Sequence, residues 1–212
     1  MKRYRYYIFD IDGTLIDTEA TGILSLQQTI RELMHLEMDY EEVRPYFGIP
    51  SGTVPGLLGY DDAEGFLELW EALFVKKMVD AQAFPGVKEM LEKLRERGIR
   101  LGCVSSRTRM EFNNDMHFRP LASLFEVTIL SEDSEKHKPD PDPLFAFYRK
   151  MEALTGEPVK PEECLYLGDT VHDSSCAHGA GCDFALADWR KRGAGDIQAE
   201  YVFSSADEIL SI

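Results

Sequence analysis

From Val87 onward the sequence alternates between short apolar runs that are typical of β-strands and longer stretches with the apolar period of helices. The strand-like runs cover residues 100–104, 127–130, 164–167 and 184–187, and a further run, residues 4–9, opens the chain. Strands that are separated by helices form parallel sheets, because each crossover helix returns the chain to the same end of the sheet. The alternation therefore predicts an α/β fold built on a parallel sheet.

Residues 17–83 interrupt this alternation. Apolar side chains recur at helical spacing within residues 23–34 and 66–74, and no convincing strand occurs between Thr18 and Ala83. The segment between the two helices, residues 45–59, is rich in proline and glycine and is predicted to be mostly loop. We therefore expect a helical subdomain, residues 17–83, inserted into a core formed by residues 1–16 and 84–212.

The charge of the chain excludes one large class of partner. Its formal net charge is −15, whereas nucleic-acid binding depends on lysine and arginine side chains that neutralise phosphates. A small anionic substrate remains compatible with this charge, provided that a local cluster of cations attracts it. The sequence does not indicate an oligomeric state.

The cysteines and the apolar runs indicate the cellular compartment in which the protein is expected. The four cysteines form no C-x-x-C pair, and Cys103 and Cys164 lie inside strand-like runs, so buried thiols in a reducing cytosol are expected. No apolar run approaches the roughly 20 residues of a membrane helix, and no signal peptide is recognised, so no membrane partner is expected. The predicted location is the cytoplasm.

Polar side chains follow the predicted strands at the edge where a parallel sheet binds its ligands. They are Asp10 and Asp12 after the first strand, Ser105 and Ser106 after the second, Lys138 in the loop after the third, and Asp169 and Asp173 after the fourth. Two carboxylates about 4 Å apart repel by roughly 4 kcal/mol at an effective dielectric constant near 20, so such a cluster needs a cation. Mg²⁺ suits it best, because this ion prefers carboxylates, waters and substrate phosphate as ligands.

These residues resemble the motifs of the haloacid dehalogenase-like hydrolase superfamily. Asp10-Ile11-Asp12-Gly13-Thr14-Leu15 is similar to the first motif, and Ser105 at a strand end is similar to the second. Lys138-Pro139 with Pro141 resembles the third motif, and Gly168-Asp169 with Asp173 resembles the fourth. The motifs occur in the family order and span nearly the whole chain, and the phosphoglycolate-phosphatase-like branch is the most similar group.

The resemblance implies a Rossmann-like core with an inserted helical cap, and it implies a role for each motif residue. Asp10 is then the nucleophile and Asp12 the general acid and base. Ser105 binds the phosphoryl oxygens, and Lys138 offsets the negative charge of nucleophile and phosphate. The Asp10 side chain, the Asp12 carbonyl and Asp169 hold Mg²⁺, with Asp173 assisting directly or through water.

The expected activity is therefore Mg²⁺-dependent hydrolysis of a small phosphorylated metabolite through an aspartyl-phosphate. Ser106, Arg44 and Arg107 are candidate substrate-binding residues, and the cap segment from Arg44 to Pro50 is the expected reader of the leaving group. Two alternatives stay open: a catalytically weak regulatory protein that binds phosphate or metal on the same fold, and a phosphonatase or phosphomutase variant.

Overall fold

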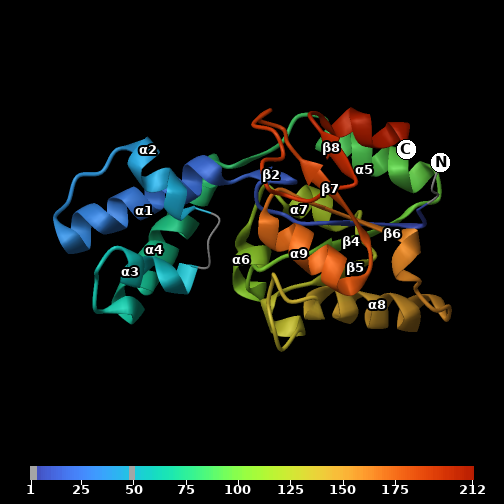
Figure 1. Cartoon of the computed structure of the whole chain (residues 1–212), viewed down its shortest axis with the longest axis horizontal. Coiled ribbons are helices and arrows are strands. Elements are labelled where there is room, and N and C mark those ends of the chain that lie inside the picture. The colour runs from blue at the N-terminus through green and yellow to red at the C-terminus, as the bar shows by residue number, and fades with distance from the viewer. Residues whose placement is uncertain (1–3, 48–50) are drawn as a thin grey trace. The chain divides into compact units, whose positions relative to one another are not determined.

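The computed structural model describes residues 4–47 and 51–212 (Figure 1). The chain divides into two compact units, one formed by residues 1–16 and 83–212 and the other by residues 17–82. Two short strands, β2 (Ile16–Asp17) and β3 (Gln82–Ala83), pair where the chain passes between the units. The expectation that the inserted stretch contains no strand is therefore wrong at its end, because a two-residue strand is too short to leave a sequence period.

The larger unit is built on a six-stranded parallel sheet with the order β5-β4-β1-β6-β7-β8. Its strands are β1 (Tyr6–Phe9), β4 (Arg100–Val104), β5 (Val127–Ile129), β6 (Cys164–Gly168), β7 (Asp183–Ala187) and β8 (Tyr201–Phe203). The prediction of an α/β fold with a parallel sheet is confirmed. The last strand was not predicted, because β8 is a three-residue edge strand with one buried residue and lacks the continuous apolar run of a central strand.

Helices cover both faces of this sheet (Figure 1). One face carries α8 (Asp142–Thr155) and α9 (Val171–Ala180), and the other carries α5 (Val87–Glu96) and the 3₁₀ helix η6 (Ala206–Ser211). Gly102 in β4 allows α8 to approach closely, since a Cβ atom at that position would lie 2.1 Å from the Phe147 ring. Shorter helices complete the connections: α6 (Arg109–Asn114), α7 (Arg119–Ala122), η4 (Ser131–Asp133) and η5 (Pro161–Glu163).

The smaller unit is a helical bundle in which α1 (Glu19–Met34) packs against α4 (Ala63–Lys77). Its buried core includes Ile23, Leu26 and Ile30 of α1 and Phe66 of α4. Between these helices lie α2 (Tyr40–Val43), η1 (Arg44–Tyr46), η2 (Ser51–Thr53) and α3 (Val54–Leu57), and η3 (Met78–Asp80) follows α4. Residues 45–59, predicted to be mostly loop, thus include short helices. Proline there is compatible with a helix because it stands in the first turn of η1 and of α3.

All four cysteines are free and buried, as the sequence predicted. Among the described residues, no helix combines the length and the apolar character that crossing a membrane requires.

Candidate active site

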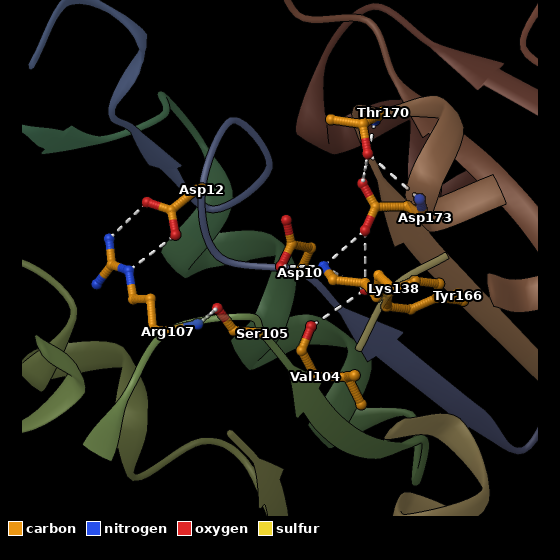
Figure 2. Close-up of polar contacts among 9 residues, drawn as sticks. All are labelled: Asp10, Asp12, Val104, Ser105, Arg107, Lys138, Tyr166, Thr170 and Asp173. Atoms are coloured by element: carbon orange, nitrogen blue, oxygen red, sulfur yellow. Dashed lines mark hydrogen bonds and ion pairs between the residues drawn. The ribbon is translucent and has the colours of Figure 1, made fainter. Parts of the chain in front are cut away.

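The carboxyl ends of three neighbouring strands bring the predicted side chains together (Figure 2). Asp10 follows β1, and the two strands that pair with β1 end beside it, with Ser105 following β4 and Asp169 following β6. Ladder hydrogen bonds continue one residue past the strands, since the Asp10 N–H donates to the Leu167 carbonyl at 2.8 Å. The backbone at this edge is therefore held by the sheet itself.

Lys138 is the cation of the cluster. It comes from the loop that precedes α8, and its Nζ donates to Asp10 Oδ1 at 2.8 Å, to Asp173 Oδ1 at 2.7 Å and to the Tyr166 hydroxyl at 3.1 Å. Burial lowers the pKa of Lys138, but the charges of Asp10 and Asp173 outweigh burial and raise it overall. Lys138 therefore stays charged, with its three ammonium donors engaged.

Asp173 is fixed by the start of α9. Its Oδ2 accepts from the Thr170 hydroxyl at 2.6 Å and from the Thr170 N–H at 3.1 Å, while its own N–H donates to Thr170 Oγ1 at 3.2 Å. This is a capping box, which satisfies donors at the first turn of a helix. Burial raises the pKa of Asp173, but the Lys138 charge and the hydrogen bonds lower it further, so the group is a carboxylate.

Three carboxylates form a candidate cation site. Asp10, Asp169 and Asp173 each place one oxygen within 4.8 Å of the others. Within the described part of the chain, the buried Oδ1 of Asp169 has no hydrogen-bond partner. Burial, together with the charges of Asp173 and Asp10, raises the pKa of Asp169 well above its usual range. An orphaned buried oxygen beside two further acids fits a divalent cation such as Mg²⁺, which would supply the missing positive charge.

Two glycines leave room for these acids. A Cβ atom at Gly13 would lie 2.1 Å from Asp169 Oδ2, and one at Gly168 would lie 2.4 Å from the Asp173 Cβ. Gly13 also has φ +76°, a left-handed conformation that other residues adopt only with strain. The glycine of the first motif is therefore required both by the turn and by the carboxylate beside it.

Gly13→Ala is accordingly expected to displace Asp169 and to lower kcat by at least about 100-fold, with a loss of more than about 1 kcal/mol of stability from the φ alone. Steady-state kinetics and urea denaturation measure the two effects. Gly98→Ala, where φ is +77° and no atom lies within 4 Å of the added Cβ, is the control for the conformational strain. Equal catalytic losses in the two variants would show that contact with Asp169 does not matter.

Asp12 lies on the other side of Asp10 and is bound by Arg107 (Figure 2). Arg107 Nε donates to Asp12 Oδ2 and Arg107 Nη2 donates to Asp12 Oδ1, both at 2.8 Å. Arg107 Nη1 donates to Asp115 Oδ2 at 2.5 Å. Burial lowers the pKa of Arg107, but Asp12 and Asp115 raise it overall, so the guanidinium remains charged between two carboxylates.

The other residues proposed to bind substrate have different surroundings. Ser105 is buried and its Oγ accepts from the Arg107 N–H at 3.2 Å, whereas Ser106 is exposed. Arg44 belongs to the smaller unit, where its Nη1 lies 3.3 Å from Glu41 Oε2. The end of the predicted reader segment, residues 48–50, lies outside the described residues. Substrate binding by Ser106, Arg44 and Arg107 stays a prediction.

The sequence did not single out several residues that contact the site. The Tyr166 hydroxyl lies 3.1 Å from both Asp173 Oδ1 and the Val104 carbonyl, in addition to its contact with Lys138. Asp115 holds Arg107. Trp189, which follows β7, supports the first motif, because its Nε1 donates to the Thr14 carbonyl at 2.8 Å.

Comparison with known proteins identifies the family. Residues 7–187 match the family model of haloacid dehalogenase-like hydrolases. A relative in Caldanaerobacter subterraneus, named for the pyrophosphatase PpaX, is 33% identical over 86% of this chain and 80% of its own. Phosphoglycolate phosphatase of Nitrosospira multiformis is 28% identical over 82% of this chain and 78% of its own.

A crystal structure from Lactobacillus plantarum, named for phosphoglycolate phosphatase, superposes with a TM-score of 0.87. It is 26% identical to this chain, and the match covers 99% of each protein. The matched family model, the fold and the strand-end residues thus agree with one another. The chain belongs to the haloacid dehalogenase-like hydrolase family, and within that family it is a phosphatase.

Proposed function

We propose that the chain is a Mg²⁺-dependent phosphatase that hydrolyses a small phosphorylated metabolite through an aspartyl-phosphate on Asp10. The observation that carries this proposal is the setting of Asp10. Its carboxylate accepts from Lys138 and lies within 4.8 Å of the oxygens of Asp169 and Asp173. A nucleophilic carboxylate between a fixed ammonium and a candidate cation site is suited to attack a phosphoryl group.

In the first step an Asp10 oxygen attacks the phosphorus atom while the bond from phosphorus to the leaving oxygen breaks. Asp12 must be protonated for this step, so its bidentate pair with Arg107 describes the carboxylate form that follows proton transfer. The protonated Asp12 gives its proton to that leaving oxygen. Lys138 offsets the charge of Asp10 and the phosphoryl oxygens, and Ser105 Oγ, at the end of β4, donates to one of those oxygens. Asp10 is thereby converted into an acyl phosphate, which divides one difficult displacement into two easier ones.

In the second step a water molecule attacks the same phosphorus atom, and the bond from phosphorus to Asp10 breaks. Asp12, now a carboxylate, takes the proton from the water, so it acts first as an acid and then as a base. Inorganic phosphate leaves, and Asp10 and Asp12 return to their starting states.

A bound Mg²⁺ would supply positive charge next to the phosphoryl oxygens. Asp10, Asp169 and the Asp12 backbone carbonyl are the proposed ligands, with Asp173 assisting directly or through water. Asp173 also holds Lys138 at 2.7 Å, so one carboxylate links the two positively charged partners of the site.

The names of the relatives suggest the substrate class. PpaX proteins are named as pyrophosphatases, and other relatives are named as phosphoglycolate phosphatases. Both substrates are small and carry a second anionic group beside the reacting phosphate. We therefore place pyrophosphate and 2-phosphoglycolate first, with the helical unit acting as a cap over the leaving group. The buried free cysteines support a reducing compartment such as the cytoplasm.

A panel of phosphorylated metabolites that includes pyrophosphate and 2-phosphoglycolate, scored by kcat/KM with Mg²⁺ and with EDTA, tests the proposal. One or a few substrates should reach at least about 10⁴ M⁻¹s⁻¹, and EDTA should abolish turnover. Flat values near background would favour the alternative of a regulatory protein that binds phosphate or metal. A rearranged product that keeps its phosphate would favour a mutase.

Mg²⁺ is expected to stabilise the protein more at pH 8 than at pH 5.5. Burial raises the pKa of Asp10 to about 7, with Asp173 and Asp12 adding to the rise and Lys138 opposing it. The raised pKa means that a proton on Asp10 stabilises the metal-free fold at low pH, and this contribution is lost as pH rises through 7. Mg²⁺ needs the carboxylate forms of both Asp10 and Asp169, and the pKa of Asp169 is raised as well. Its apparent affinity should therefore fall by at least about tenfold per pH unit well below 7.

The Mg²⁺-induced change in Tm, recorded at pH 5.5, 7 and 8, measures this competition. Asp169→Asn should remove most of the change at every pH, because it neutralises a proposed ligand while keeping the side-chain volume. A change in Tm that is the same at all three pH values would contradict the proposed link between Asp10 and the metal.

A further inference from the structure

The contacts of Arg107 point to a role in positioning. We infer that Arg107 fixes the Asp12 carboxylate for proton exchange with the leaving group, and that Asp115 holds Arg107 in place for this purpose. The inference rests on the phosphatase activity proposed above. It adds two residues, Arg107 and Asp115, that act through Asp12 and do not themselves touch the reacting atoms.

The pair between Arg107 and Asp12 has a geometry that fixes orientation. Two guanidinium nitrogens, Nε and Nη2, each donate to a different Asp12 oxygen at 2.8 Å. Parallel bonds of this kind set both the distance and the plane of the carboxylate, which a single hydrogen bond cannot do. Asp12 is part-exposed, with 32% of its side chain accessible, so the carboxylate that Arg107 orients can still be reached from solvent.

Arg107 is itself held from several sides. Asp115 accepts from Arg107 Nη1 through Oδ2, and its Oδ1 accepts from the backbone N–H groups of His117 at 2.7 Å and Phe118 at 2.9 Å. The Arg107 N–H donates to Ser105 Oγ, and the Arg107 carbonyl accepts from the Ser131 N–H at 3.0 Å. The Arg107 and Asp115 side chains are 5% and 1% exposed, so solvent does not loosen this chain of contacts.

The same contacts argue against Arg107 as a reader of the substrate. Each of its three guanidinium nitrogens already donates to a carboxylate, and the side chain is buried. A substrate anion that took the same two parallel N–H groups, on Nε and Nη2, would have to displace Asp12, the group proposed to exchange protons with that substrate. Orientation of Asp12 is therefore the role that keeps every observed contact intact.

This role predicts an effect that depends on the leaving group. An alkoxide needs a proton as the ester bond breaks, whereas p-nitrophenolate leaves without one, so only alkyl esters depend on a well-placed Asp12 in the first step. The ratio kcat/KM reports events up to that first irreversible step. Loss of positioning should therefore lower kcat/KM selectively for alkyl phosphates, within the range of about 10²–10⁴ that proton transfer contributes.

The experiment compares glycerol 2-phosphate with p-nitrophenyl phosphate in the wild type and in Arg107→Ala, Arg107→Lys and Asp115→Asn. For Arg107→Ala we expect kcat/KM to fall by at least about 100-fold with glycerol 2-phosphate and by less than about fivefold with p-nitrophenyl phosphate. Added guanidinium should restore part of the loss.

Asp12→Asn should show the same selectivity without rescue. Arg107→Lys keeps the charge but not the bidentate pair, so it should share the selective loss, and Asp115→Asn should show a smaller one.

The outcomes separate this inference from the proposed function. A wild type that is inactive with both esters and with the panel that includes pyrophosphate and 2-phosphoglycolate would refute the phosphatase proposal itself. An active wild type with equal losses for both esters in the Arg107 variants, or a rise in KM alone, would overturn positioning and favour substrate binding or a structural role. If Arg107→Ala does not fold, the ratio between the two esters in Arg107→Lys and Asp115→Asn decides the question in the same way.

Discussion

Asp10→Asn is expected to reduce kcat by at least about 10⁴-fold, whichever substrate the wild type prefers. An amide oxygen is a poor nucleophile, so no acyl phosphate can form at this position. The side chain keeps its volume. Its amide oxygen can still accept from Lys138 Nζ, which lies 2.8 Å from Asp10 Oδ1 in the wild type. The loss should therefore fall on the chemical step. Single-turnover kinetics measure it, and acid-quenched wild type should carry a phosphoryl group on the peptide containing Asp10.

Asp10 is both the proposed nucleophile and a proposed metal ligand, and a matched variant separates the two roles. Asp169→Asn removes a carboxylate from the same cluster without touching the nucleophile, so its activity should recover in part at high Mg²⁺ concentration. Asp10→Asn should not recover at any concentration. If both variants recover to the same degree, Asp10 acts only as a ligand and the covalent intermediate is refuted.

The convergence of the central candidate residues could be predicted from the sequence, because the signals there are local and the sheet is parallel. The apolar strand before Asp10 and the strand before Asp169 are both visible in the sequence, and parallel strands end at one edge. Neighbouring strands β4, β1 and β6 then place Ser105, Asp10 and Asp169 side by side. The convergence of these residues follows from topology without knowledge of any long-range contact.

Several pairings around the site were not predicted, although Asp12 and Arg107 were themselves predicted as site residues, because no sequence pattern links the partners. Arg107 and Asp12 are 95 positions apart, and no spacing in the sequence links either one to Asp115. Tyr166 is an aromatic residue inside a buried strand, and only the structure reveals that its hydroxyl meets Lys138. The capping box of Thr170 and Asp173 has a recognisable spacing, because the two residues stand three positions apart, but it was not predicted.

Lys138→Met is expected to lower the free energy of unfolding of the metal-free protein by about 3–5 kcal/mol. Lys138 pairs with two buried carboxylates, Asp10 and Asp173, and all three side chains are at most 8% exposed. Methionine keeps most of the volume but leaves both acids in a buried site without their cation. Urea denaturation in EDTA measures this loss.

Phosphoryl transfer by Lys138→Met should also fall to background, because no other described side chain donates to Asp10 through an ammonium group.

The double variant Lys138→Met/Asp173→Asn tests the cause of that loss. Removing one of the two uncompensated charges should restore part of the stability, so the double variant should be more stable than Lys138→Met alone, a non-additivity expected of groups in contact. Lys136→Met is the matched surface control, because Lys136 is 72% exposed and its ammonium group pairs with Asp140, and it should change stability by less than about 0.5 kcal/mol. Additive losses in the double variant would mean that Lys138 stabilises the fold through packing. A cation other than Lys138 would then have to offset the negative charge of Asp10. A Mg²⁺ ion at the candidate site formed by Asp10, Asp169 and Asp173 would be that cation.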